Sequence, residues 1–335
     1  MTTVIKASGP ADLLGLIPSL LGFTPTQSLV LIPFKDGRSM GAMRFDLPDP
    51  NDDDAVERCT TTAADYVTRV PEVTHALAVV YTGADHGGAI TVLFAIQAQL
   101  LAHELGVADL LYVSALGWGS LLEGTGPTPM SEIPVKLDAP GFTGDQATGA
   151  ELPVIDKRRA ARISQRVLHA DEHDPSLQLL VLMEKAATEP LTPVLLGALH
   201  WNLERPSLRD PLLIAWAQDQ DAGTDALLAQ MDWAEGHPYP QKIAAIMWGE
   251  GSRPDPARLR QSLENVRTLL AVAPSAGCYA TAAWLAWALG QSTHAEVYAD
   301  AGLELEPEHG LCGIVVTFVQ NGHLPAWAFE KGAKA

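Results

Sequence analysis

His75-Ala-Leu-Ala-Val-Val-Tyr81 is an apolar run without alternation of polar and apolar residues, which is typical of a strand buried on both faces of a sheet. The glycine-rich turn Gly83-Ala-Asp-His-Gly-Gly88 follows it. An apolar helical segment over 89–105 and a second buried strand over 107–116 come next. Strand, helix and strand in this order predict a βαβ unit with two parallel strands.

The residues before this unit predict further layers. Pro10 and Asp12 mark the start of a helix, and residues 28–33 form a compact apolar strand. The turn Lys35-Asp-Gly-Arg38 leads to a return strand over 39–47, and a helix follows to about Val70. We therefore expect a three-layer α/β domain over 1–150, with a mixed, mostly parallel sheet. Its last part, 117–152, is rich in Gly, Pro and Thr and is predicted to be a long loop.

The pattern from residue 153 to residue 335 is helical throughout and predicts an all-α domain. Proline and glycine separate short amphipathic segments, as expected for helical hairpins. Residues 276–307 are the best single case and resemble one tetratricopeptide-type hairpin, although no clean second copy is present. The predicted helices are 156–173, 176–188, 192–203, 210–220, 223–234, 239–248, 255–272, 276–289, 292–305 and 309–321.

The protein is strongly acidic. Its 335 residues include 22 Lys and Arg and 40 Asp and Glu, which gives a formal net charge of −18. A field of this sign repels phosphate groups, so we expect neither a nucleic acid nor an anionic membrane surface as the partner. Both halves are acidic, so no acidic tail explains the charge.

The cysteines and the lengths of the apolar runs indicate the cellular compartment. The three cysteines, Cys59, Cys278 and Cys312, are far apart and fit neither a disulfide framework nor a cysteine-rich zinc site. The N-terminus has no signal-peptide pattern, and no apolar run approaches the ~20 residues that span a bilayer. We expect a soluble, cytoplasmic protein.

The turn after the first buried strand is a candidate ligand site, because ligands of α/β folds often bind at the carboxyl ends of strands. Its sequence is neither a dinucleotide fingerprint nor a Walker A motif, so a plain strand-to-helix turn is the alternative. Arg44 and Asp46 equally fit a sheet-edge ion pair, and Ser28 lacks the G-x-S-x-G setting of a nucleophile. The candidate ligand-binding residues are Gly83, Asp85, His86, Gly87, Gly88, Arg44, Asp46, Trp118 and Ser120.

One dense basic cluster lies at the start of the helical domain, over residues 157–166. Arg158, Arg162 and Arg166 share a helix face at spacings of four residues. They are candidates for docking an anion or an acidic partner. Pairing with the chain's own carboxylates, at Asp156, Asp171 and Glu172, is the interpretation that the acidic composition favours.

Residues 169–173 match the pattern H-x-x-E-H. On a helix, His169 and His173 would lie one turn apart and suit a zinc ion, with Glu172 as general base. Pro175 ends the helix directly afterwards, and no third ligand is indicated. A solvated helix end explains the same residues, and we predict neither a metal nor another cofactor.

The strings Asp12-Leu-Leu-Gly-Leu-Ile-Pro18, Leu20-Leu-Gly-Phe-Thr-Pro25 and Ser28-Leu-Val30 resemble an actinobacterial family, the domain of unknown function 4192. Arg44-Phe-Asp-Leu-Pro48 and the segment from Trp284 to Pro307 are also similar to it. The resemblance implies no activity and no catalytic residues. Many members look as if they carry a W-x-S string followed by a cysteine-rich stretch. In this chain Trp118-Gly-Ser120 is not followed by any nearby cysteine, which argues against an essential metal centre at that place.

Two functions remain open from the sequence. The absence of a complete catalytic motif favours a non-enzymatic protein-interaction or scaffold protein, which would bind another protein or itself. The alternative is a small-molecule hydrolase or transferase, with its site at the carboxyl ends of the strands of the N-terminal domain. This alternative requires a cleft beside Asp85 and His86 with at least two converging polar side chains.

Overall fold

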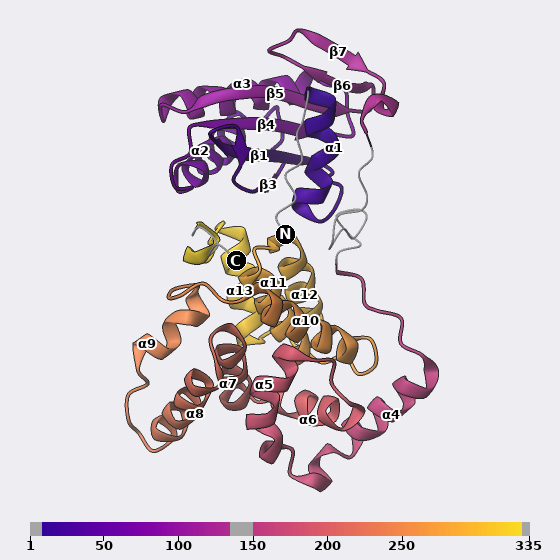
Figure 1. Ribbon diagram of the computed structural model, residues 1–335, viewed down its shortest axis with the longest axis vertical. Coiled ribbons are helices and arrows are strands. Elements are labelled where there is room, and N and C mark those ends of the chain that lie inside the picture. The colour runs from indigo at the N-terminus through magenta and orange to yellow at the C-terminus, as the bar shows by residue number, and fades with distance from the viewer. Residues whose placement is uncertain (1–8, 135–149, 330–335) are drawn as a thin grey trace. The chain divides into compact units, whose positions relative to one another are not determined.

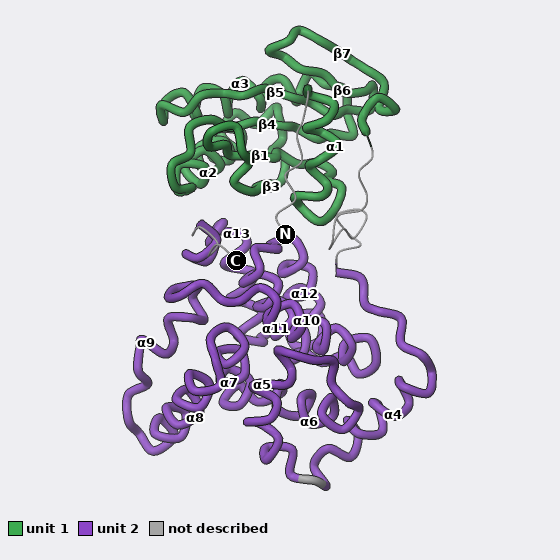
Figure 2. Tube along the Cα trace, in the orientation of Figure 1, with its two compact units in different colours: residues 1–149, 331–335 green, residues 150–330 purple. Residues whose placement is uncertain are grey.

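The computed structural model describes residues 9–134 and 150–329. The chain divides between residues 149 and 150 into two compact units, called unit 1 and unit 2 here (Figure 2). Unit 1 contains the sheet, and the described part of unit 2 is helical (Figure 1). No helix within the described ranges is long and apolar enough to cross a membrane.

The sheet of unit 1 has the strand order β2-β1-β4-β5-β6-β7, and β3 pairs with β1. The central strands are apolar at most of their buried positions, as the sequence predicts for strands covered on both faces, and the exceptions in β5 are Asp109 and Ser114. The strands are β1 (Ser28–Lys35), β2 (Arg38–Ser39), β3 (Met43–Asp46), β4 (His75–Tyr81), β5 (Gly106–Ser114), β6 (Gly117–Ser120) and β7 (Thr125–Thr128).

Helices cover both faces of this sheet, which confirms the three-layer prediction (Figure 1). Helix α1 (Pro10–Leu21) packs Leu14 and Ile17 against one face of the sheet. Helices α2 (Asp53–Thr68) and α3 (Gly87–Ala102) cover the other face. Helix α2 begins as its sequence indicates, because the Asp52 side chain accepts a hydrogen bond from the backbone N–H of Ala55.

The sheet is mixed, as predicted, but its strands are not mostly parallel. Among the described strands, only β4 and β5 run parallel, on either side of the α3 crossover. Strand β1 is antiparallel to β4, because the β1–β3 hairpin reverses the chain before the α2 crossover and β4 then lies beside β1. Hairpins also add β6 and β7 to the far edge.

The segment 117–152 is not the continuous loop that its composition suggested. Residues 117–128 form the β6–β7 hairpin, a 3₁₀ turn covers Met130–Glu132, and residues 135–149 lie outside the described part. The glycines of this hairpin are required by close packing. A Cβ at Gly119 would lie 2.4 Å from the hydroxyl of Tyr112, and one at Gly126 would lie 2.6 Å from it. The composition of residues 117–128 is typical of a loop, but tertiary packing makes them strands.

Unit 2 consists of short helices whose starts follow the sequence signals. Proline stands in the first turn of α6, α7 and α10, and Asp156, Thr192 and Ser275 cap their helices. The α-helices are α4 (Lys157–Leu168), α5 (Leu179–Thr188), α6 (Pro193–Leu203), α7 (Pro206–Ala217), α8 (Gln220–Ala234), α9 (Gln241–Ala244), α10 (Pro256–Leu270), α11 (Ala276–Ala288), α12 (Ser292–Leu305) and α13 (Gly310–Gln320).

Tryptophan side chains fill the core of unit 2. Trp216, Trp284 and Trp287 are fully buried, so the tryptophan-rich helix α11 belongs to the packing core. Their indole N–H groups donate to the backbone carbonyls of Leu182, Met247 and His323. Helices α11 and α12 form the predicted hairpin, in which Gly290 supplies a left-handed residue with φ of 77°.

Candidate functional site

The strand register gathers several predicted site residues at one end of the sheet in unit 1. Ser28, the first residue of β1, pairs with Asp46 of β3 on one side and with Tyr81 of β4 on the other. The end of β3 therefore lies close to the turn that follows β4. Arg44 and Asp46 thus share this edge with the turn 83–88.

Backbone contacts hold the turn in place. The N–H of Gly83 donates to Oε1 of Gln27 at 2.6 Å, and the N–H of Gly87 donates to Oδ1 of Asp85 at 2.9 Å. Gly88 lies against Pro50, where a Cβ would come within 2.6 Å of the proline ring. The Asp85 carboxylate thus closes its own turn, which is an ordinary role for aspartate before a helix.

His86 lies on an aromatic platform that the sequence did not reveal. Its ring stacks on Tyr112 of β5, with centroids 5.0 Å apart and an angle of 19° between the planes. The hydroxyl end of Tyr112 lies over Gly119 and Gly126 of the β6–β7 hairpin. His86 Nδ1 is buried and has no hydrogen-bond partner in the described part of the protein. A tyrosine in the middle of an apolar strand gives no local signal for this role.

The residues proposed at the sheet edge contact one another. Arg44 donates from Nε to the hydroxyl of Ser28 at 2.8 Å and forms an ion pair with Asp46. Ser28 is fully buried and donates to the carbonyl of Thr26 at 2.7 Å. Arg44 and Asp46 therefore form the expected sheet-edge pair, and the Ser28 hydroxyl is occupied in the way of a structural side chain.

Trp118 and Ser120 are buried in the β6 strand. The Ser120 hydroxyl donates to Oδ1 of the buried Asp109 at 2.8 Å and accepts from the backbone N–H of Glu123. Trp118 packs with α1 on the face of the sheet opposite to Tyr112. These two side chains therefore lie within the unit, and they do not converge with His86 on one surface.

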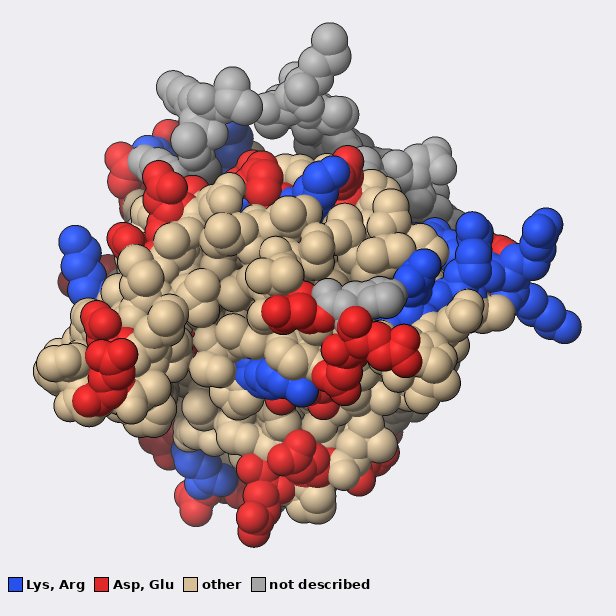
Figure 3. Space-filling model, turned by 90° about the horizontal axis from the view of Figure 1, so that it is seen from below, with Lys and Arg blue, Asp and Glu red and all other residues tan. Residues whose placement is uncertain are grey.

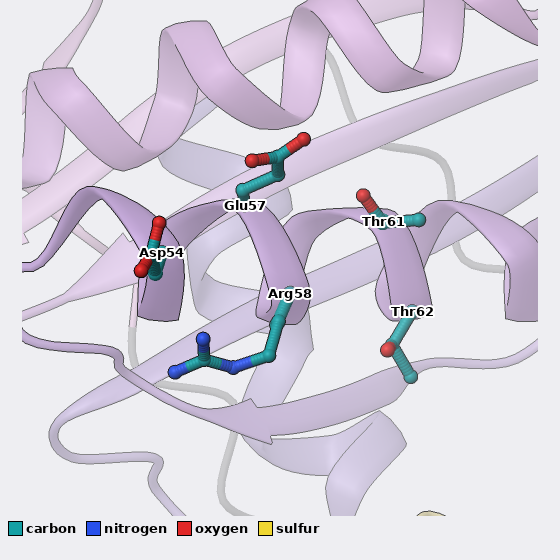
Figure 4. A pocket seen from close by; sticks show the side chains of 5 residues that line it. All are labelled: Asp54, Glu57, Arg58, Thr61 and Thr62. Carbon is teal, nitrogen blue, oxygen red and sulfur yellow. The ribbon is translucent and has the colours of Figure 1, made fainter.

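Two hollows in the described part of the protein lie away from this end of the sheet. In unit 1, a shallow hollow of about 430 Å³ runs along α2 and is lined by Asp54, Glu57, Arg58, Thr61 and Thr62 (Figure 4). All five side chains come from a single helix, and Glu57 and Arg58 point to different sides of it (Figure 4). Groups from one solvated helix face cannot surround a ligand, so this hollow carries no chemistry.

The basic stripe of α4 does not pair with the carboxylates that the sequence proposed for it. Asp156 caps the helix by accepting from the backbone N–H groups of Arg158 and Arg159. Asp171 accepts from the Trp201 indole, and Glu172 accepts from His169. Within the described ranges, no ion pair involves Arg158, Arg162 or Arg166. The prediction of internal pairing is therefore wrong for the described residues.

The H-x-x-E-H segment does not form the α-helical turn that a zinc pair would need. Helix α4 ends at Leu168, and a separate 3₁₀ turn covers Ala170–His173. The proposed base Glu172 bonds His169 Nδ1 at 2.9 Å. The segment thus has the geometry of a helix end, as the alternative interpretation held.

A second hollow lies in unit 2 between α7, α8 and the segment after α8. It has a volume of about 560 Å³, which is within the usual range for ligand and peptide pockets. Trp233 borders it with 60% of its surface exposed. The lining residues are Pro206, Ser207, Asp210, Ile214, Gln230, Trp233, Tyr239, Ala244 and Met247. We call this hollow the α7/α8 groove.

A buried arginine orients the carboxylate on the polar side of the α7/α8 groove. Arg209 is buried and binds Oδ1 of Asp210 through Nε at 2.9 Å and Nη2 at 2.8 Å. Arg209 Nη1 lies 3.5 Å from Nε2 of His309, whose pKa is lowered by burial and by the Arg209 charge. Burial and the Asp210 charge raise the pKa of Tyr239. The groove therefore combines apolar walls with an oriented carboxylate and a neutral phenol.

A group with metal-ligand chemistry, which the sequence analysis missed, joins α6 to α11. The ligand atoms of His200, Glu204 and Cys278 lie within 4.8 Å of one another. Each has an ordinary role: Glu204 accepts from the Ser275 hydroxyl at 2.5 Å, and burial raises the pKa of the Cys278 thiol to about 12. Burial also lowers the pKa of His200. We interpret the group as a packed helix junction.

Comparison with known proteins identifies one family. Residues 10–139 match the family model described as Domain of unknown function (DUF4192). This match confirms the resemblance seen in the N-terminal strings. No curated protein and no solved structure matches the chain.

Proposed function

Residues 10–139 carry a domain of the family of unknown function 4192, whose description states no activity, and we propose a function from the geometry instead. The protein is a non-enzymatic interaction protein. Its helical unit binds a short segment of a partner protein in the α7/α8 groove, and its α/β unit serves as the scaffold.

The observation that carries this proposal is the exposed tryptophan beside an apolar groove. Tryptophan is enriched among the residues that dominate protein interfaces. Trp233 borders the groove with its side chain exposed. Ile214, Ala244 and Met247 provide an apolar lining that would hold one large side chain.

Charge indicates the kind of segment that fits. Asp210 uses Oδ1 for Arg209, and its Oδ2 has no partner among the described residues. Glu235 is exposed at the end of α8 and has no ion pair in the described part. A segment with an apolar anchor and an adjacent lysine or arginine would satisfy both the groove and these carboxylates.

Selection of short random peptides displayed on phage against the purified full-length chain tests the proposal. We expect the enriched peptides to share a large apolar residue beside a basic one. Ala244→Trp fills the groove and should weaken their binding by about 10-fold or more. Ala234→Trp places the same side chain outside the groove lining and should leave binding unchanged. Failure to enrich any peptide, or equal binding by both variants, would refute the proposal.

The enzymatic alternative has one observation in its favour, the buried and unpartnered Nδ1 of His86 beside Asp85. Hydrolysis of p-nitrophenyl acetate and p-nitrophenyl phosphate tests it. A hydrolase site here predicts turnover that His86→Ala abolishes and that Ala244→Trp leaves unchanged. No turnover, or equal turnover by His86→Ala, would count against it.

A further inference from the structure

Helix α4 presents a cationic face that its own unit does not neutralise. Its twelve residues include one lysine and four arginines and no acidic residue. Only Ile163 is buried, whereas Arg158, Arg162 and Arg166 are exposed on one face. Figure 3 shows Lys and Arg side chains projecting together over α4, while Asp and Glu outweigh Lys and Arg among the charged residues on the rest of that face. At 1.5 Å per residue, the three arginines span about 12 Å.

Helix α8 presents the opposite charge with a similar spacing. Asp221, Asp225 and Asp232 are exposed and lie on one face together with Leu228, at positions i, i+4, i+11 and i+7. None of these carboxylates forms an ion pair with a described residue. This acidic stripe spans about 16 Å along the helix.

The acidic stripe of α8 is separate from the α7/α8 groove. The residues of α8 that pack on its own unit are Gly223, Ala226 and Ala229, and a Cβ at Gly223 would lie 2.5 Å from Ala215 of α7. By helical geometry these small residues lie on the side of α8 away from the stripe. The stripe therefore remains available when the groove is occupied.

The two stripes match in chemistry and length. Arginine side chains are long enough to absorb the difference between 12 and 16 Å and can bind carboxylates through two parallel hydrogen bonds. Leu228, which lies within the acidic stripe of α8, is 53% exposed and adds apolar area to that side of the contact. In unit 2, α4 and α8 lie on opposite sides (Figure 1). One copy therefore cannot pair its own two stripes.

We propose that a second copy of this chain docks here, with α4 of one copy lying along the acidic stripe of α8 of the next. The contact is head-to-tail, so it builds rings or open chains rather than a two-fold dimer. A nucleic acid would meet the same arginines, but its phosphates would leave the acidic stripe of α8 without a partner, whereas a second copy uses both stripes. The acidic residues of α12 are a poorer match, because Glu296 in that helix already has an interaction.

Sedimentation velocity of the full-length chain at increasing concentration tests this contact. We expect self-association in about 0.05 M salt that weakens markedly in about 0.5 M salt, because exposed charges are screened. Reversal of the basic stripe (R158E, R162E and R166E together) should weaken association by about 100-fold. Reversal of the acidic stripe (D221R, D225R and D232R together) should do the same.

Mixing the two reversed variants gives the decisive result. The first variant carries two acidic stripes and the second carries two basic ones, so each alone repels itself but the pair is complementary. We expect an equimolar mixture to associate again, which also shows that both variants are folded. The matched control reverses Asp300 and Glu304 of α12 to arginine and should associate as the unmodified chain does.

Four results would overturn the proposal. One is an unmodified chain that stays monomeric in low salt up to about 200 µM. The second is a mixture that stays monomeric although both variants keep the native circular dichroism. The third is a loss of association in the α12 control equal to that of the α8 variant. The last is a monomeric chain that binds labelled double-stranded DNA through the three arginines.

Discussion

Two glycine-to-alanine substitutions in unit 2 should change its stability in opposite directions. Gly197 lies in α6 and faces α4, where a Cβ would come within 2.8 Å of the carbonyl carbon, carbonyl oxygen and Cβ of Arg166. Gly313 lies in α13, where a Cβ would meet nothing within 4 Å. Both glycines lie inside helices, so alanine increases the helix propensity equally at the two positions. The two substitutions therefore differ only in how the added methyl group packs.

Helix propensity and packing together set the expected changes in the free energy of unfolding. Replacing glycine by alanine inside a helix stabilises it by up to about 1 kcal/mol. Overpacking against backbone atoms costs about 1–3 kcal/mol, because the neighbouring helix must move. Gly313→Ala should therefore raise the free energy of unfolding by about 0.5–1 kcal/mol, and Gly197→Ala should lower it by up to about 2 kcal/mol. The two variants should differ by roughly 2 kcal/mol.

Urea unfolding followed by tryptophan fluorescence measures this difference. Seven of the eight tryptophans lie in unit 2, so the signal reports mainly on that unit. With an m-value of about 2 kcal/mol/M, the two midpoints should lie about 1 M apart. If Gly197→Ala is as stable as Gly313→Ala, α4 does not pack on α6 as described. The position of the basic stripe of α4 would then also be wrong.

Three further perturbations test the interior of the protein. Asn265→Leu should destabilise unit 2 by about 3 kcal/mol in the same urea assay, because the Asn265 side chain binds one backbone N–H and two backbone carbonyls in the interior. A loss of stability below about 1 kcal/mol would contradict these hydrogen bonds. Ellman's reagent should label Cys278 only on unfolding, since burial raises its pKa to about 12. Rapid labelling of native protein whose half-buried Cys59 and buried Cys312 are replaced by alanine would disprove its burial. Acidification from the ordinary histidine pKa of 6.5 to about pH 5.5 should lower the urea midpoint, because the unfolded chain takes up protons that buried neutral histidines in the folded protein do not. A midpoint that is constant or rises over this range would contradict the lowered pKa values of His200, His294 and His309.

Local sequence determined most of the secondary structure. The helices of unit 2 begin at Pro193, Pro206 and Pro256, and the capping residues Asp52 and Ser275 accept hydrogen bonds from the first turns of theirs. These signals act within a few residues, because a proline ring fixes one torsion and a cap satisfies one nearby N–H. The predicted starts at 192 and 255 lie within one residue of the observed ones, whereas α7 begins four residues before the predicted 210 and α4 ends at Leu168 instead of 173.

The candidate sites depended on contacts that no local pattern contains. The cationic face of α4 was visible at its four-residue spacing, but whether the chain neutralises it depends on where Asp171 and Glu172 point. The α7/α8 groove joins residues from Pro206 to Met247 through the packing of α7 on α8. Its apolar walls resemble other apolar positions of the sequence, and the exposure of Trp233 is visible only in the structure.

The sequence alone determined the two-part order of strands and helices, the apolar central strands and the acidic charge. The tertiary structure decided the direction of β1 relative to β4 and the conversion of residues 117–128 into strands. Strand direction depends on which neighbour a strand joins after a crossover, and the glycines of the hairpin are needed by the distant Tyr112. Such long-range contacts are chosen by the packing of the whole unit, whereas caps and turns need only their neighbours in sequence.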